Sequence, residues 1–161
     1  MVVSRAVAVG GTFDVLHAGH KRLLAKAFEV GDTVFIGVAG DRLVSTLQKD
    51  HRVRSFASRY RDVRAFIKSK GWMRRARIVE LKDPFGPAAR RKLLDALVVS
   101  EETRPSGAKL NSLRRRHGFP PVRLYVVKLV KAEDGLPITS SRIRRKEIDL
   151  DGRLVRKSRG H

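Results

Sequence analysis

Residues 10–20, GGTFDVLHAGH, combine the side chains in this sequence best suited to chemistry. His17 and His20 are three positions apart, so one turn of helix would bring both imidazoles to the same side. The glycines at its start would leave backbone N–H groups free near a helix N-terminus, where phosphate groups are favoured. We therefore expect both histidines to donate hydrogen bonds to phosphate oxygens as negative charge builds up in a transition state.

Two other interpretations of this histidine pair remain open. The imidazoles could cap a helix or fill a position at its rim, which is a purely structural role. They could also bind zinc, but zinc needs a third ligand and Asp14 is the only close candidate. The glycine turn, together with a second polar segment downstream, favours phosphate, and we predict no dedicated metal site.

That second segment is residues 138–144, ITSSRIR, which bring hydroxyl groups, backbone donors and guanidinium groups together. Thr139, Ser140 and Ser141 follow Pro137 and would lie at the start of a helix. Taken alone, they could be ordinary N-caps, which occur in proteins of every function. Paired with residues 10–20, they predict a triphosphate cradle in which Arg144 neutralises charge.

The elements that must position these residues alternate along the chain. Apolar, β-branched runs predict five strands, at residues 6–9, 33–38, 77–81, 96–100 and 122–130. Helical patterns fall between them, at 21–30, 58–70, 87–95 and 106–117, and glycines 31, 71 and 118 are expected to end three of them. This order predicts an α/β fold, a Rossmann-like doubly wound five-stranded parallel sheet in a single domain. Ligands of such sheets bind at the carboxyl ends of the strands, where both polar segments would lie.

Composition limits the class of protein. The 161 residues suit one domain, which we place at 1–150, followed by a polar, basic and loose tail at 151–161. Cysteine is absent and no apolar run is long enough to span a membrane, so we expect a cytoplasmic protein without disulfides. The net charge of +20 would attract polyanions, and nonspecific nucleic-acid binding is one consequence. The oligomeric state is left open.

Residues 10–20 closely resemble the His-x-Gly-His signature of the α/β nucleotidyltransferase superfamily, and residues 138–144 resemble its Ile-Ser-Ser-Thr-x-Ile-Arg signature. Residues 98–107, VVSEETRPSG, and 132–135, AEDG, are similar to the archaeal and eukaryotic type of phosphopantetheine adenylyltransferase. That resemblance implies transfer of an adenylyl group from ATP to 4′-phosphopantetheine, giving dephospho-coenzyme A and pyrophosphate. It also implies direct in-line attack, with Mg²⁺ carried by the ATP.

The resemblance further implies roles for individual residues. His20, Lys49 and His17 would be the catalytic residues. The acceptor would be bound by Thr12, Asp14, Lys49 and Arg59, although residues 55–59 read SFASR where the family has Pro-Tyr-x-x-Arg. ATP would be bound by Gly11, Thr12, Phe13, His17, Gly19, His20, Glu101, Thr103, Thr139, Ser140, Ser141 and Arg144, with Glu101 and Thr103 on the adenosine side.

Two alternatives to this function are kept. The same chemistry could serve another phosphorylated acceptor, such as nicotinamide mononucleotide, flavin mononucleotide or glycerol 3-phosphate, with ATP or CTP as donor. Cytidylyltransferases of the superfamily usually carry Arg-x-x-Gly-Ile-Ser-Thr downstream; residues 134–140, DGLPITS, lack that arginine, which favours ATP. The second alternative is a nucleic-acid-binding protein on a related scaffold.

Overall fold

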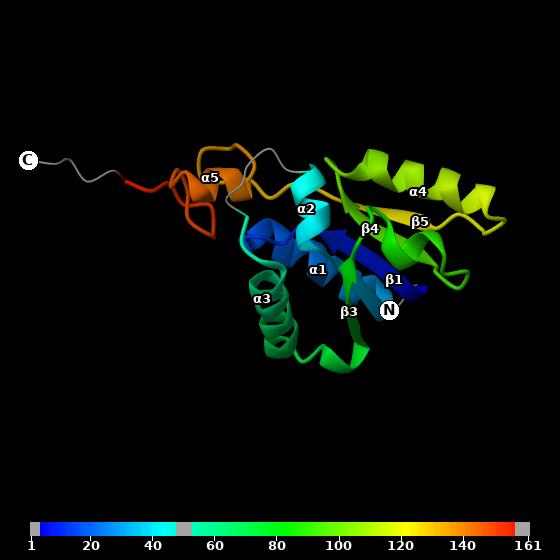
Figure 1. Cartoon of the computed structure of the whole chain (residues 1–161). Helices are drawn as coiled ribbons and strands as arrows, with labels where there is room; N and C mark the ends of the chain where they lie inside the picture. The colour runs from blue at the N-terminus through cyan, green and yellow to red at the C-terminus, as the bar shows by residue number, and fades with distance from the viewer. Residues whose placement is uncertain (1–3, 48–52, 157–161) are drawn as a thin grey trace, which may run out of the picture.

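A computed structural model describes residues 4–47 and 53–156 and contains one five-stranded parallel sheet (Figure 1). Its strand order is β3-β2-β1-β4-β5, which places β1 at the centre. The strands are β1 (Ser4–Gly11), β2 (Gly31–Ala39), β3 (Ala76–Leu81), β4 (Ala96–Ser100) and β5 (Arg123–Val127). The predicted single α/β domain with a Rossmann-like sheet is confirmed. The fifth strand is shorter than expected, because residues 128–130 leave the sheet after Val127.

Helices cover both faces of this sheet. Alternate side chains of a strand point to opposite faces, and Val7 and Val9 of β1 pack on one side with α1 (Ala18–Val30) and α3 (Phe56–Ser69). Ala8 faces the other side, where α4 (Arg104–Arg116) lies along β4 and β5 (Figure 1). A short helix, α2 (Asp41–Leu47), follows β2 and packs against the end of β3.

Three of the four predicted helices are present, and they begin two or three residues earlier than expected. His17 and Ser55 cap α1 and α3 through their side chains, which fixes the starts of both helices. Gly71 and Gly118 have φ of 74° and 75° and end the turns after α3 and α4. Gly31 instead has extended backbone, so α1 passes directly into β2 without a loop.

The helix predicted over 87–95 is wrong. Residues 82–95, which we call the wall segment, contain only a short 3₁₀ helix, η2 (Gly86–Ala89). Asp83 accepts the backbone N–H groups of Phe85 and Gly86, which fixes a turn there. The carbonyl groups of Ala88 and Arg91 accept hydrogen bonds from a side chain of α4, so they do not form the i to i+4 ladder that a longer helix needs.

The C-terminal part of the chain forms a small lobe beyond the carboxyl end of the sheet, and it carries α5 (Ser140–Arg144) (Figure 1). Ala132, Ile138 and Ile148 form its buried cluster. The backbone N–H of Ala18 donates to Leu150 at 3.1 Å, which ties the lobe to the start of α1.

Residues 151–156 continue this lobe. Gly152 accepts a hydrogen bond from the backbone of Glu133, and Val155 donates to Glu147. The part of the expected tail that the structure describes is therefore bonded to the lobe. Among the described residues, no helix is long and apolar enough to cross a membrane.

Candidate active site

The turn after β1 leads the chain into the histidine pair. Phe13 has a φ of 51°, a left-handed conformation that is uncommon for a residue with a side chain. Its ring is completely buried and meets the ring of His20 edge-on, with 5.3 Å between centroids. Burial of the ring holds this backbone conformation in place. Phe13 therefore shapes the turn, and its ring offers no surface to a ligand.

His17 is both a helix cap and a potential donor. Its Nδ1 accepts hydrogen bonds from the backbone N–H groups of Gly19, at 3.0 Å, and His20, at 3.4 Å. An Nδ1 that accepts carries no proton, so the proton of the neutral ring lies on Nε2. The capping and phosphate interpretations are thus compatible, because the cap orients the Nε2 donor. Gly19 is required beside it, since a Cβ there would lie 2.9 Å from Cε1 of His17.

His20 stacks on His17, with 3.7 Å between ring centroids and an interplanar angle of 17°. Its Nδ1 lies 3.1 Å from the carbonyl oxygen of Val15 and 3.4 Å from the backbone nitrogen of His17, so either neutral tautomer finds a partner there. Burial lowers the pKa of His17 to about 4. Burial, with a smaller contribution from the neighbouring His17, lowers the pKa of His20 to about 3. Both rings are therefore neutral at pH 7.

This burial predicts how stability depends on pH. The ordinary pKa of 6.5 applies to both imidazoles in the unfolded chain, so between pH 6.5 and 5 the unfolded state binds protons that the folded state does not. The free energy of unfolding should fall by up to about 1.4 kcal/mol per imidazole for each pH unit below 6.5. Urea unfolding at several pH values measures this slope.

A matched pair of variants separates the histidines' contribution to the pH dependence of the free energy of unfolding from the contribution of the carboxylates. The double variant His17→Gln/His20→Gln should lose most of the slope between pH 6.5 and 5. The exposed His117, changed to glutamine, should leave it intact. An unchanged slope in the double variant would contradict the neutral, buried state of the pair.

Asp14 joins the two polar segments of the sequence. Its side chain is 2% exposed and forms an ion pair with Arg144 of α5, 130 residues away in the sequence. Its Oδ1 also accepts from the backbone nitrogen of Arg54 at 3.0 Å, and the Arg54 Nε lies 3.4 Å from the same oxygen. Asp14, expected at the acceptor, thus holds two arginines beside the histidine pair, and this engagement argues against a zinc ligand.

The hydroxyl groups of residues 139–141 sit at the start of α5. Oγ1 of Thr139 accepts the backbone N–H of Arg142 and so caps the helix. The Arg142 guanidinium pairs with Asp134 and, at 3.0 Å, with Glu147, which holds α5 in the lobe. Oγ of Ser141 accepts from Arg144 at 3.4 Å. Ser140 and Ser141 therefore lie one helical turn or less from the arginine that reaches Asp14.

Arg59 differs from its expected role. Its side chain is completely buried, and its guanidinium donates to the carbonyl oxygens of Thr12, at 2.9 Å, and Ala39, at 2.6 Å. It also donates to Arg54 O at 2.9 Å and to Asp41 Oδ1 at 3.1 Å. Arg59 thus ties the turn after β1 to the end of β2 and has no surface to offer an acceptor.

The remaining expected residues are placed as follows. Glu101 and Thr103 are exposed at the carboxyl end of β4, where Thr103 Oγ1 accepts the backbone N–H of Ser100 at 2.9 Å. Lys49 lies outside the described residues. Arg54, next to Asp14, was missed because no motif or spacing in the sequence marks it out. Within the described residues, no three His, Asp or Glu side chains are grouped to hold a metal ion.

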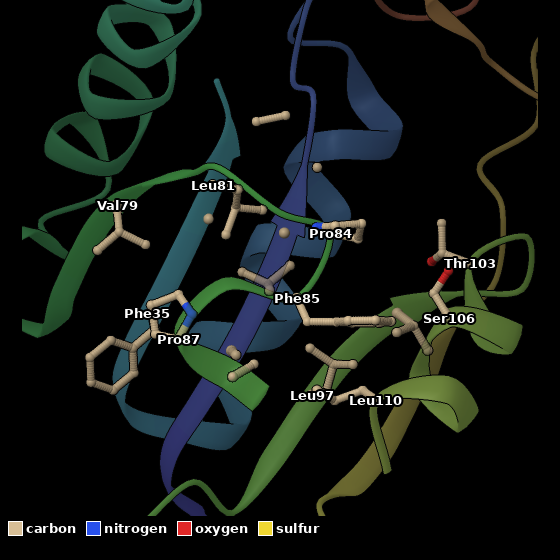
Figure 2. Close-up of a pocket in the computed structure, with 18 of the residues that line it drawn as sticks. Phe35, Val79, Leu81, Pro84, Phe85, Pro87, Leu97, Thr103, Ser106 and Leu110 are labelled. Carbon is tan, nitrogen blue, oxygen red and sulfur yellow. The ribbon is translucent and has the colours of Figure 1, made fainter. Parts of the chain in front are cut away.

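A cavity of about 310 Å³ opens beside this site on the face of the sheet that α4 only partly covers. Figure 2 shows apolar side chains of β2, β3, β4 and the wall segment around it, with Thr103 and Ser106 contributing hydroxyl groups. Gly10, Gly11 and Thr12, which lead from β1 into the turn before the histidines, also line it. Leu81 forms part of the floor, and it fits there because Gly37 and Gly86 lack a Cβ that would come within 2.7 and 2.4 Å of it. An elongated, largely apolar group with an anionic end would fit this arrangement.

The fold and this phosphate-directed site define the class of protein, and a family model described as cytidylyltransferase-like matches residues 8–146. The chain belongs to this family of nucleotidyltransferases. It is 39% identical to the phosphopantetheine adenylyltransferase of Methanothermobacter thermautotrophicus over 96% of this chain and 92% of that protein. It is 47% identical to the protein of the same name from Methanopyrus kandleri, over 87% of this chain and 88% of that protein. Within this superfamily, the chain thus belongs to the archaeal type of the phosphopantetheine adenylyltransferase family.

Solved structures agree on the fold. A protein of unknown function from Archaeoglobus fulgidus is similar with a TM-score of 0.68 and 33% identity, over 76% of this chain and 88% of that one. Pantothenate synthetase from Thermus thermophilus is similar with a TM-score of 0.57 and 21% identity, over 88% of this chain and 62% of that one. At that identity, the second likeness supports the fold alone.

Proposed function

We propose that this chain transfers the adenylyl group of ATP to 4′-phosphopantetheine, forming dephospho-coenzyme A and pyrophosphate. The observation that carries this proposal is the apolar cavity lined in part by Gly10, Gly11 and Thr12, the residues that lead from β1 towards the neutral histidine pair. The pantetheine arm would lie in the cavity. Its phosphate would then meet ATP at the carboxyl end of β1, as expected for a ligand of this fold.

The reaction is an in-line attack of the acceptor phosphate oxygen on the α-phosphorus of ATP, with pyrophosphate leaving. The Nε2–H of His17 and the ring of His20 would donate to the α-phosphate as its charge rises. In the tautomer that donates to phosphate, Nδ1 of each neutral ring accepts from a backbone N–H and Nε2 carries the proton, so the rings need no rearrangement at that moment. The residues therefore act by positioning and by electrostatic stabilisation, without a covalent intermediate.

The remaining phosphates would be held by the second segment. Ser140, Ser141 and Arg144 would bind the β- and γ-phosphates, with Gly11, Thr12 and the backbone of Phe13 on the opposite side. Arg144 reaches this place because Asp14 pairs with it. Lys49 is proposed to bridge the acceptor phosphate and the transferred group. Glu101 and Thr103 are proposed to lie on the adenosine side.

We propose Mg²⁺ as the ion that accompanies ATP. When bound, it would neutralise charge on the β- and γ-phosphates. The described residues offer no cluster of carboxylates for it, and Asp14 is paired with arginine, so the ion fits as part of the nucleotide complex. We further propose a cytoplasmic location, in keeping with two small, water-soluble substrates.

Two other functions are compatible with parts of the chain. The same site could serve a different phosphorylated acceptor, but a nucleotide acceptor would place a second base in the apolar cavity. Nonspecific binding of nucleic acid is favoured only by the net charge of +20. Neither alternative accounts for the cavity and the phosphate site together.

A pyrophosphate-release assay with ATP and Mg²⁺ tests the proposal. We expect turnover with 4′-phosphopantetheine and little with nicotinamide mononucleotide, flavin mononucleotide or glycerol 3-phosphate. A parallel series with CTP should be slow, and reactions without acceptor give the background. Turnover with another member of the panel alone would keep the chemistry and overturn the acceptor. No turnover with any acceptor would overturn the proposed function itself.

A further inference from the structure

Arg114 of α4 is a buried cation that the proposed chemistry does not use. Its side chain has no exposed surface, and within the described part of the chain no carboxylate pairs with it. It donates instead to backbone carbonyl oxygens: Nη1 to Ala88 at 2.7 Å and to Arg91 at 2.8 Å, Nη2 to Lys92 at 3.3 Å, and Nε to Pro120 at 2.9 Å. Burial lowers the pKa of Arg114 below its ordinary value.

Three of these four carbonyl groups belong to the wall segment, residues 82–95. This segment lines the cavity through Phe85 and Pro87, which are labelled in Figure 2, and through Ala88 and Arg91. Its own backbone bonding is sparse, since η2 is a single short turn. The guanidinium of Arg91 lies 4.1 Å from the ring centroid of Phe35, which is also part of the cavity lining. Arg114 therefore holds the wall segment in place through hydrogen bonds to its backbone.

The chemistry of the guanidinium group explains why an arginine occupies this position. Burying a cation without a counter-ion is costly, and hydrogen bonds from a charged donor to carbonyl groups offset that cost. A planar guanidinium presents several donors in a fixed fork and can reach carbonyls on both sides of it. A lysine ammonium at the same place would reach fewer of them.

We propose that Arg114 is a positioning residue that sets the shape of the acceptor cavity by holding the wall segment against the sheet. The inference rests on the proposed function for the identity of the acceptor. The proposed phosphate contacts of ATP come from residues 10–20 and α5, and its proposed adenosine contacts from Glu101 and Thr103. None of the hydrogen bonds of Arg114 reaches any of these residues. Loss of the guanidinium should therefore affect the acceptor and spare the nucleotide.

The test compares Arg114→Lys and Arg114→Ala with Arg115→Gln, a change at the next, exposed position of the same helix. In Arg114→Lys, KM for 4′-phosphopantetheine should rise by about tenfold or more, equivalent to one or two of these hydrogen bonds. KM for ATP should change less than about twofold. Added guanidinium ion should restore part of the acceptor KM in Arg114→Ala, and Arg115→Gln should behave as the unaltered enzyme.

A second measurement needs no substrate. Hydrogen exchange of the Arg90 and Arg91 amides, which both donate to Pro87, should accelerate in Arg114→Lys while amides of β1 and β2 stay protected. Equal rises in both KM values, or unchanged exchange in the wall segment, would overturn the proposal. If the unaltered enzyme does not turn over 4′-phosphopantetheine, the proposed function fails, and accelerated exchange would still support the fastening role. A failure of both variants to fold even with guanidinium ion would count against positioning and for a purely structural role.

Discussion

Replacing His20 with alanine is expected to lower kcat by about 10²- to 10³-fold, the usual loss when one donor to a developing anion is removed. The effect on KM for ATP should be small, because the triphosphate keeps its contacts to His17, Arg144 and the hydroxyls of α5. The ring of His20 stacks on His17, and its Nδ1 lies 3.4 Å from the backbone nitrogen of His17; when Nδ1 accepts from that N–H, the single proton of the neutral ring is on Nε2. Its donor is thus placed before the substrate arrives, and preorganisation of this kind favours the transition state.

Steady-state kinetics with ATP and 4′-phosphopantetheine measure both parameters. His117→Ala is the matched control, since His117 is exposed at the end of α4. His20→Gln adds a useful intermediate, because an amide can still donate from a similar position. If turnover survives in His20→Ala, the role proposed for this ring is wrong. If KM for ATP rises while kcat holds, His20 binds the ground state only.

Arg59→Ala is expected to destabilise the protein by about 3–5 kcal/mol, as when one partner of a buried charged network is removed. The carbonyls of Thr12 and Ala39 would lose a charged donor in a buried position. Because Thr12 belongs to the turn that carries the histidines, kcat should fall as well. The variant's losses should thus appear in stability and turnover together.

Chemical unfolding measures the first effect, with Arg64→Ala as an exposed control on the same helix. The sequence alone suggests a different outcome, in which Arg59 contacts the acceptor. On that hypothesis, the free energy of unfolding would be nearly unchanged and only KM for the acceptor would rise. The two results are distinct, so the experiment decides between a structural fastening and a binding role.

The sequence was a good guide to the strands and to the positions of residues 10–20 and 138–144 at helix starts. Buried parallel strands are continuous apolar, β-branched runs, so β1 to β4 could be located within two residues or so of their ends. The histidine spacing and the hydroxyl cluster involve residues that are close in the sequence, so their placement does not depend on distant contacts. That is why His17 and His20 could be placed on one helix start from residues 10–20 alone.

The burial of Arg59 and Arg114 could not be predicted from such local patterns. Arginine is mostly exposed, and a strongly basic composition makes any single one unremarkable. Arg59 and Arg114 are buried because they satisfy carbonyl groups up to 47 and 26 positions away in the sequence. Those partners are fixed only by the tertiary fold. The helix expected over 87–95 was wrong for the same reason, because three of its carbonyl groups, those of Ala88, Arg91 and Lys92, accept hydrogen bonds from Arg114.

The ion pair between Asp14 and Arg144 has a consequence for how the enzyme becomes active during its synthesis. Domains begin to fold from the N-terminus while the ribosome is still adding residues. The histidine-bearing turn emerges first, yet its arginine partner lies 130 residues later. A nascent chain, or one truncated before α5, can therefore contain the sheet and both histidines and still lack Arg144, the cation proposed to bind the triphosphate. On that proposal, we expect nucleotide chemistry to begin only when nearly the whole chain has been made.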